Sequence, residues 1–239
     1  MLAAAAALTF SAAGAAYAQA QVAEDPAFTA KLRASLDANP ELITQAMEAA
    51  QNKQRQAEQA DMLTRVDPAR PALFADDFGP FIGNPNGTVR VVEFVDYACP
   101  ICKSSNASIE SIVSKRDDVR ITIAMRNIFG EDSDKLARFA LASSLQGKFA
   151  ETHTALYEAF GDHHQTKPDE AALRGVAKAA GLNYDKVAAD MNGPVVNAML
   201  EKQTELANQI GVSGTPFFVT SDAVYPGAAP EEVMNEAFR

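Results

Sequence analysis

Cysteine is scarce in this sequence, because the chain of 239 residues contains only Cys99 and Cys102. No other cysteine is present to form a structural bridge. A disulfide between these two closes a loop too short to restrict the unfolded chain much, so the fold does not depend on disulfides for its stability. The pair can serve as a structural staple, as half of a metal site or as a redox pair.

Histidine is scarce too, which argues against the metal site. A structural zinc ion has about four ligands, and only His153, His163 and His164 could supplement the two thiolates. His163 and His164 lie in a polar segment typical of a solvated loop. His153 lies on an apolar helical stripe, where a core histidine or one that supports a site is expected. We predict neither a metal site nor a cofactor.

An excess of basic residues is also missing. The formal net charge is −10 at pH 7, and an acidic surface disfavours nucleic acids and anionic membranes as partners. We therefore predict no nucleic-acid partner.

Long apolar runs are confined to residues 1–20, which are rich in alanine. The run ends in Ala-Tyr-Ala-Gln-Ala, with small residues at the spacing that signal peptidase reads. It is short for a membrane span, and the alternative is an alanine-rich buried helix. No Lys or Arg precedes the apolar core, and a start codon assigned too late would explain that. We expect a cleaved signal peptide and a soluble, periplasmic protein.

Residues 26–66 predict two helices with too little apolar surface to form a core. Phe28, Leu32 and Leu36 follow a helical period, and Asn39-Pro40 is a typical helix start. The second helix, at about 40–66, is mostly polar in its later half, so it lies in solvent or pairs with copies of itself. Two prolines and a glycine-rich stretch follow, and they predict a linker.

The remaining chain alternates strands and helices in the order of an α/β layered domain with a helical insertion. The expected elements are a buried strand at 88–95, a helix from Cys99 to about 115, a strand at 119–128, helices between 132 and 208, a hairpin after residue 215 and a closing helix near the end. A βαβ unit followed by a ββα unit fits this order.

Cys99 falls where the strand gives way to the helix. A thiolate there faces unpaired N–H groups at the positive helix end, which lowers its pKa. Cys102 lies one turn further and faces inward. This geometry favours attack by Cys99 on a disulfide and resolution by Cys102. Pro100 keeps the first helical turn rigid.

Glu93 and the Thr215-Pro216 pair are the other candidate residues, each with an ordinary alternative. A carboxylate within an apolar strand is costly unless it is used or hydrated, so Glu93 could exchange a proton with Cys102. The alternative is an outward-facing acid on a half-exposed strand. A cis bond before Pro216 would present the Thr215 backbone to a bound chain, but the local sequence alone favours an ordinary trans turn.

The stretches EFVDYACPICK and GVSGTPFFVTSDAVYPGAAP, with the helical insertion between them, resemble the DsbA-like branch of the thioredoxin superfamily. The resemblance covers about residues 76–239 in order. It implies that Cys99 is the nucleophile, that Cys102 resolves the mixed disulfide and that Glu93 is a buried proton acceptor. It also implies a cis bond between Thr215 and Pro216.

The resemblance further implies that Pro100, Ile101, Thr215 and Pro216 contact the client chain and that Cys99 and Cys102 form the redox disulfide. The dipeptide between the cysteines departs from the family pattern. It is Pro-Ile, not the Pro-His of strongly oxidising members or the Pro-Tyr of many relatives. Without an imidazole there, the helix end must stabilise the thiolate.

The N-terminal stretch DPAFTAKLRASLDANPELITQAMEAAQNKQ resembles the oligomerisation segment of the ScsC family of copper-sensitivity suppressors. A self-associating arm, as a trimer or a dimer, favours a disulfide isomerase. The alternatives are a dithiol oxidase of DsbA type and a non-enzymatic copper(I)-binding protein that uses the same two thiolates. Expected partners are exported proteins with thiols or disulfides, and a membrane redox protein that recycles the pair.

The expected fold class is therefore α/β, a thioredoxin-like fold with an inserted helical domain and an N-terminal helical arm. The predicted boundaries are a signal peptide at 1–20, an oligomerisation arm at 21–66, a linker at 67–87, a thioredoxin-like domain at 88–131 and 209–239, and the inserted helical domain at 132–208.

Overall fold

The computed structural model describes residues 25–161 and 166–239. The predicted signal peptide, His163 and His164 lie outside these residues. The chain divides into two units, one that ends at Gln54 and one that covers Arg55–Arg239. Within the described ranges, no helix combines the length and the apolar character that crossing a bilayer requires.

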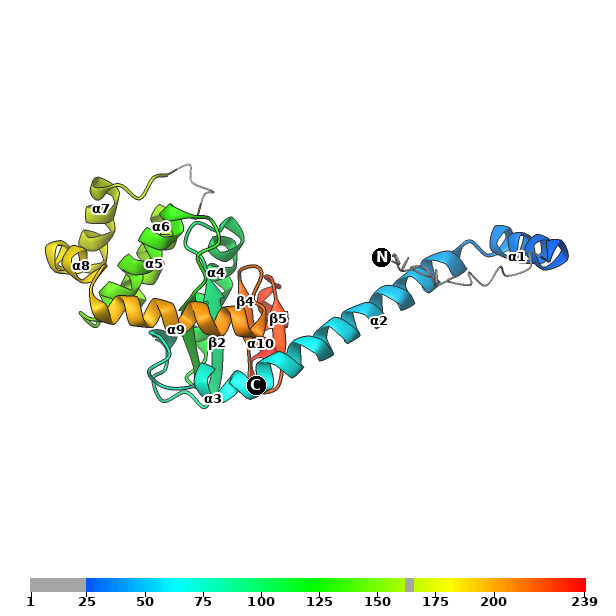
Figure 1. The fold of residues 1–239 in the computed structure, drawn as a ribbon, viewed down its shortest axis with the longest axis horizontal. Helices are drawn as coiled ribbons and strands as arrows, with labels where there is room; N and C mark the ends of the chain where they lie inside the picture. Colours follow the sequence, from blue (N-terminus) through cyan, green and yellow to red (C-terminus); the bar gives the residue numbers. More distant parts are fainter. Residues whose placement is uncertain (1–24, 162–165) are drawn as a thin grey trace, which may run out of the picture. The chain divides into compact units, whose positions relative to one another are not determined.

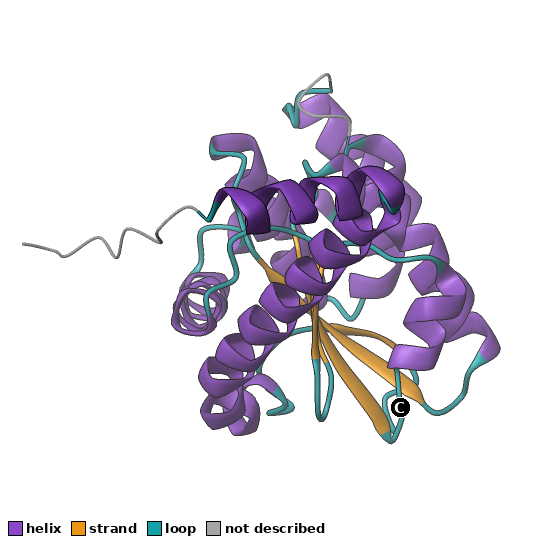
Figure 2. Cartoon of the chain, turned by 90° about the vertical axis from the view of Figure 1, so that its right-hand side faces the viewer, coloured by secondary structure: helices purple, strands orange, loops and turns teal. Residues whose placement is uncertain are grey.

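A five-stranded mixed sheet in the order β1-β3-β2-β4-β5 forms the centre of the second unit. The parallel pair β2 and β3 lies in its middle, and every other neighbouring pair is antiparallel. Figure 2 shows the strands grouped together with helices packed around them. The strands are β1 (Phe81–Gly83), β2 (Val89–Val95), β3 (Val119–Met125), β4 (Phe217–Val219) and β5 (Val224–Pro226). The predicted α/β thioredoxin-like class is confirmed.

The helices follow the predicted order closely, and those between β3 and β4 gather beside the strands (Figure 1). Their bounds are α1 (Pro26–Ala38), α2 (Glu41–Val66), the 3₁₀ helix η1 (Asp67–Ala69), α3 (Arg70–Leu73), α4 (Pro100–Lys115), α5 (Glu131–Ser144), α6 (Phe149–Ala159), α7 (Glu170–Ala180), α8 (Tyr184–Asp190), α9 (Pro194–Ile210) and α10 (Glu231–Ala237). Gly181 and Gly211 end α7 and α9 in the left-handed conformation that glycine adopts without a steric cost.

Strand β2 is buried on both faces, which explains its apolar run. Val91 and Val95 belong to one hydrophobic core, which also contains Cys102 and Ile109 of α4. Val92 and Phe94 belong to a second core on the other face, with Leu73 of α3 and Ile210 of α9. Since alternate residues of a strand point to the same face, Glu93 shares the face that α4 covers.

Residues 67–87 were expected to be a linker, and the structure corrects this. They contribute η1, α3 and the edge strand β1, which pairs antiparallel with β3. Leu73 and Phe78 are fully buried. A strand of three residues is too short to show the alternation that identifies strands, and Gly79-Pro80 and Gly83 around it are typical of turns.

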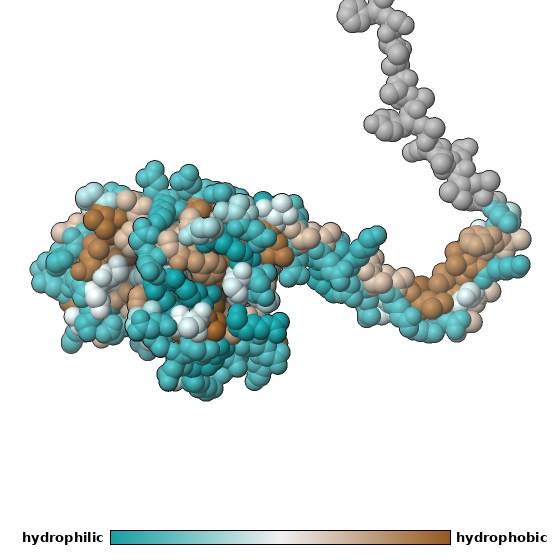
Figure 3. Space-filling model, turned by 90° about the horizontal axis from the view of Figure 1, so that it is seen from below, coloured by the Kyte–Doolittle hydropathy of each residue, from teal (hydrophilic) through white to brown (hydrophobic). Residues whose placement is uncertain are grey.

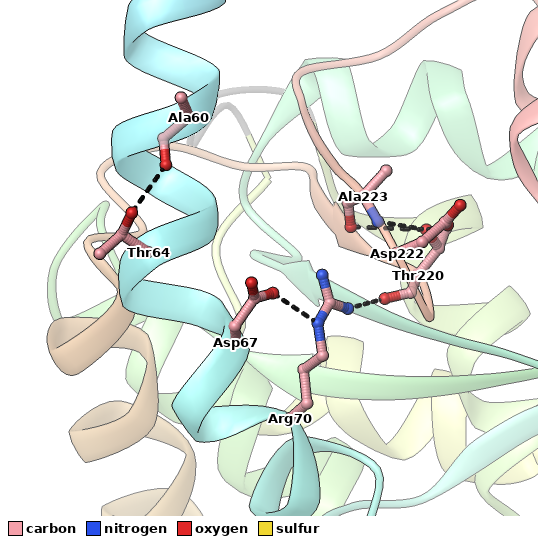
Figure 4. Close-up of polar contacts among 7 residues, drawn as sticks. All are labelled: Ala60, Thr64, Asp67, Arg70, Thr220, Asp222 and Ala223. Atoms are coloured by element: carbon pink, nitrogen blue, oxygen red, sulfur yellow. Dashed lines mark hydrogen bonds and ion pairs between the residues drawn. The ribbon is translucent and has the colours of Figure 1, made fainter.

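Side-chain contacts fasten this segment to the β4–β5 turn (Figure 4). The Arg70 guanidinium donates to the Thr220 carbonyl and pairs with Asp67 at 2.9 Å. Within the turn, the Ala223 N–H donates to the Thr220 hydroxyl at 3.1 Å. The chain that leaves α2 is therefore held against the sheet.

The last turns of α2 also belong to the second unit. Val66 is fully buried, and Met62 and Leu63 pack against the same core. The division between the units falls after Gln54, so the predicted arm boundary at residue 66 lies too far along the chain. The polar sequence of this half of α2 gave no sign that one face would be covered.

The first unit, taken by itself, has almost no core. Helix α1 buries none of its residues. A brown apolar stripe runs along this segment in Figure 3. The stripe consists of Phe28, Leu32, Leu42, Ile43 and Met47, which are 41–62 % exposed.

Candidate active site

Cys99 lies at the junction of β2 and α4, as the N-cap residue of the helix. Its sulfur accepts the backbone N–H of Cys102 at 3.4 Å. The Pro100 nitrogen carries no hydrogen. Since N–H groups in the first helical turn have no acceptor within the helix, no hydrogen bond is lost. The junction therefore points a helix N-terminus at the sulfur of Cys99.

Asp96 fixes the loop between β2 and Cys99. Its buried carboxylate accepts the N–H of Ala98 at 2.9 Å, that of Ile128 at 2.8 Å and that of Phe129 at 3.3 Å. These contacts tie the loop to the segment that follows β3. Asp96 was not predicted from the sequence, because two of its three N–H partners lie more than thirty residues away.

The two thiols are adjacent and electrostatically unequal. Hydrogen bonds lower the pKa of Cys99 to about 6, although burial opposes the shift. The Cys102 side chain donates the most important of these bonds, and backbone N–H groups at the helix start contribute less. Burial and the hydrogen bond to Cys99 raise the pKa of Cys102. The reduced pair is therefore a Cys99 thiolate beside a protonated Cys102.

Glu93 is buried, with 2 % of its surface exposed. This excludes the alternative of an outward-facing acid on a half-exposed strand. Burial raises its pKa from 4.5 to about 8, because desolvation disfavours the charged form. Near neutral pH the carboxyl group is therefore close to the balance between its two protonation states.

Glu93 predicts a pH dependence of stability. A carboxyl group whose pKa rises on folding stabilises the folded state fully below its unfolded pKa and loses that contribution as pH rises to the folded value. Between pH 4.5 and about 8, the free energy of unfolding of the oxidised protein should fall by a few kcal/mol, since one pKa unit is worth about 1.4 kcal/mol. Glu93→Gln should remove this fall. Urea unfolding across that pH range tests it, and parallel curves for the two proteins would contradict it.

The Thr215–Pro216 peptide bond is cis, so the trans turn favoured by the local sequence is wrong. The Thr215 carbonyl oxygen lies 3.6 Å from the Cys99 sulfur. Pro216 directly precedes β4, and Phe217 of that strand pairs with Phe94 of β2. The antiparallel pairing brings the residues around Pro216 to the end of β2 at which the cysteines lie.

The structure thus brings Cys99, Cys102 and Thr215 into contact and places Glu93 on the sheet face that α4 covers. Ile101 points outward and is 55 % exposed. Pro100 is half-buried. The exposed apolar side chain of Ile101 in the first turn of α4 gives the site a hydrophobic rim.

An aromatic cluster supports the cysteines from the helical insertion. Tyr97, directly before Ala98 in the active-site loop, packs against Tyr157 of α6 with ring centroids 4.9 Å apart and ring planes tilted by 46°. The ring of His153, also on α6, lies 5.6 Å from that of Tyr97. His153 is buried, as its place on the apolar stripe indicated. The two tyrosines were missed, since only tertiary packing joins them.

The arrangement offers two sulfur ligands and little else to a metal. Across residues 25–161 and 166–239, no group of three or more His, Cys, Asp or Glu side chains is placed to hold a metal ion.

Comparison with known proteins gives a consistent result. Residues 90–239 match the family model of the DSBA-like thioredoxin domain. Disulfide bond formation protein D of Bacillus subtilis is 27% identical over 167 residues, which is 66% of this chain and 74% of that protein.

Two crystal structures extend the comparison. A thioredoxin-like oxidoreductase from Silicibacter pomeroyi is 37% identical, with a TM-score of 0.63, and the match covers 70% of this chain and 94% of that one. Proteus mirabilis ScsC in a transitional conformation is 26% identical, with a TM-score of 0.62. The match covers 92% of this chain and 95% of the ScsC chain.

Proposed function

This chain belongs to the DsbA-like thioredoxin family of thiol:disulfide oxidoreductases, and we propose that it exchanges disulfides in exported proteins as a periplasmic isomerase. The observation that carries the chemistry is the unequal thiol pair. Hydrogen bonds lower the pKa of Cys99, and burial raises that of Cys102. One thiol is ready to attack at neutral pH, and the other keeps its proton until it is needed.

The reaction begins when the Cys99 thiolate attacks one sulfur of a client disulfide. The client S–S bond breaks, the other client sulfur leaves as a thiolate, and a mixed disulfide with Cys99 forms. In isomerisation, a second client thiolate attacks the client sulfur of this mixed disulfide and releases Cys99 unchanged. In net reduction, Cys102 attacks the Cys99 sulfur, so the client leaves as a thiolate and the enzyme is oxidised.

Glu93 supplies the proton exchange that the resolving step requires. Cys102 must lose its proton before it attacks, and its surroundings disfavour the thiolate. A carboxyl group with a pKa of about 8 can take that proton and return it at neutral pH. The role rests on its burial on the same face of the sheet as the cysteines.

The client chain lies against Pro100, Ile101, Thr215 and Pro216 in this proposal. The exposed Ile101 offers apolar contact, and the Thr215 carbonyl beside Cys99 suits hydrogen bonding to an extended backbone. These contacts do not depend on a particular client sequence, which fits an enzyme that must accept many misfolded chains.

The direction of exchange is inferred from the arm. Its exposed apolar stripe favours association of several copies through this segment, and several sites facing a shared space can hold a misfolded client. The location rests on the apolar run at residues 1–20, and a membrane redox protein would keep the pair in its working state.

The redox state in the cell tests the direction. We expect Cys99 and Cys102 to be reduced in freshly isolated periplasm, as shown by alkylation with a maleimide that adds mass to each free thiol. An oxidised pair would indicate a dithiol oxidase, and absence of the protein from the periplasmic fraction would contradict the location.

A further inference from the structure

A chain of three hydrogen bonds leads from the active-site loop to the part-exposed side of α4. The Tyr97 hydroxyl bonds the His153 Nδ1 at 2.8 Å, and the His153 Nε2 bonds the Asn106 Oδ1 at 2.9 Å. The Asn106 Nδ2 donates to the Glu110 Oε1 at 3.0 Å. Tyr97 and Asn106 lie within the thioredoxin-like part and His153 in the insertion, so the chain crosses between them twice.

The direction of every hydrogen in this chain follows from its outer end. A carboxylate only accepts, so Asn106 must turn its amide nitrogen to Glu110 and its oxygen to His153. That oxygen requires a hydrogen on the His153 Nε2. Burial lowers the pKa of His153 to about 3, so the ring is neutral and its Nδ1 carries a lone pair. Tyr97 must therefore donate its hydroxyl hydrogen to His153.

The direction of the Tyr97 hydrogen bond matters because Tyr97 belongs to the same buried core as Cys102. Glu93 lies on the face of β2 whose neighbours Val91 and Val95 line this core. Burial, then the nearby Glu93 and Cys102, raise the pKa of Tyr97. Cys99 and Tyr157 belong to the same core, and burial, then the nearby Cys102 and Glu93, raise the pKa of Tyr157. A hydrogen donated by Tyr97 would stabilise negative charge on Glu93 or Cys102. With its hydrogen held by His153, Tyr97 offers them none.

We propose that Glu110 is a positioning residue that sets the tautomer of His153 and so keeps the Tyr97 hydroxyl from donating to Glu93 and Cys102. Replacing the acceptor at position 110 with a donor reverses the direction of every hydrogen bond in the chain. A donor at position 110 makes the Asn106 amide turn over and donate to Nε2. The hydrogen on the His153 ring then moves to Nδ1, which donates to the Tyr97 oxygen. The hydroxyl hydrogen of Tyr97 is then free to be donated to Glu93 or Cys102.

The first test is the tautomer, measured by nitrogen-15 chemical shifts of the His153 ring in the full-length oxidised protein. The wild type should be the Nε2–H form. Glu110→Lys should convert the ring to the Nδ1–H form, and Glu110→Gln, which can donate or accept, should give a mixture. Ala107→Lys, an exposed position on the same helix, adds a positive charge outside the chain and should leave the ring unchanged. A wild-type Nδ1–H ring, or an unchanged ring in both Glu110 variants, would overturn the proposal.

The second test is the pH dependence with which Cys102 resolves a preformed mixed disulfide on Cys99. Its midpoint should move to lower pH by about one unit in Glu110→Lys, because a hydrogen bond favours the charged form that it contacts. A changed tautomer of His153 with an unchanged midpoint of the resolution rate would refute the effect of Tyr97 on Glu93 and Cys102. This part of the inference rests on the proposed function, whereas the tautomer does not. A failure of exchange in every variant is therefore distinguishable from a failure of the hydrogen-bond chain.

Discussion

The Cys99→Ser protein should show no thiol–disulfide exchange above the uncatalysed rate, whereas Cys102→Ser should accumulate mixed disulfides with its clients. Cys99 is the N-cap of α4, with its pKa lowered to about 6, so removing it removes the attacking thiolate. Cys102 is buried and protonated. Its loss leaves the first attack intact and blocks the resolving one. Non-reducing gels of periplasm, followed by mass spectrometry of the adducts, measure the difference.

The matched control is the double variant with serine at both positions, which should form no adducts. Both single variants should fold as the wild type does, because serine differs from cysteine by one atom at each site. Equal trapping by the two single variants would overturn the assignment of roles. Adducts that form only in the Cys99→Ser protein, through Cys102, would reverse the assignment of roles.

The sequence predicted the position of both cysteines at the start of a helix, because the determinants of that position are local. A strand that runs into a helix, with cysteines at the first position and one turn later, identifies Cys99 and Cys102 without knowledge of the tertiary fold. Glu93 is also local, because it interrupts an apolar strand. Its burial follows from cores on both faces of the sheet, whereas the sequence had left an outward-facing acid as the alternative.

The contacts that tune the site could not be predicted, because they join distant segments. Tyr97 and His153 are 56 positions apart, and His153 and Asn106 are 47 apart. No periodicity links such residues. From the sequence, the apolar stripe left His153 open as a core histidine or one that supports a site, and only the folded chain shows its partners.

The misplaced end of the arm has a similar cause. The late half of α2 is polar on most faces, and periodicity cannot show that Met62, Leu63 and Val66 meet a core built partly from residues near 220. The correction changes how the arm should be removed. A deletion that extends to residue 66 would strip buried side chains from the second unit, so it should stop at Gln54.

Deleting residues 21–54 should convert a homo-oligomer, a trimer or a dimer, into a monomer that still exchanges simple disulfides. Helix α1 buries nothing within the chain, and the stripe that includes Phe28 and Met47 is exposed. Covering each such side chain contributes about 1 kcal/mol or more, so association of copies along the stripe is favourable. Light scattering at micromolar concentration measures the assembly, and reduction of insulin measures simple exchange.

The truncated protein should lose most of its activity on scrambled ribonuclease, because single sites no longer surround one misfolded client. Phe28→Asp combined with Met47→Asp should act like the deletion while keeping the arm, and Gln45→Glu, an exposed polar position on α2, should have no effect. A monomeric wild type would mean that the stripe is covered by another partner, and the isomerase proposal would fall with it. A monomeric deletion with full activity on scrambled ribonuclease would instead separate assembly from isomerisation.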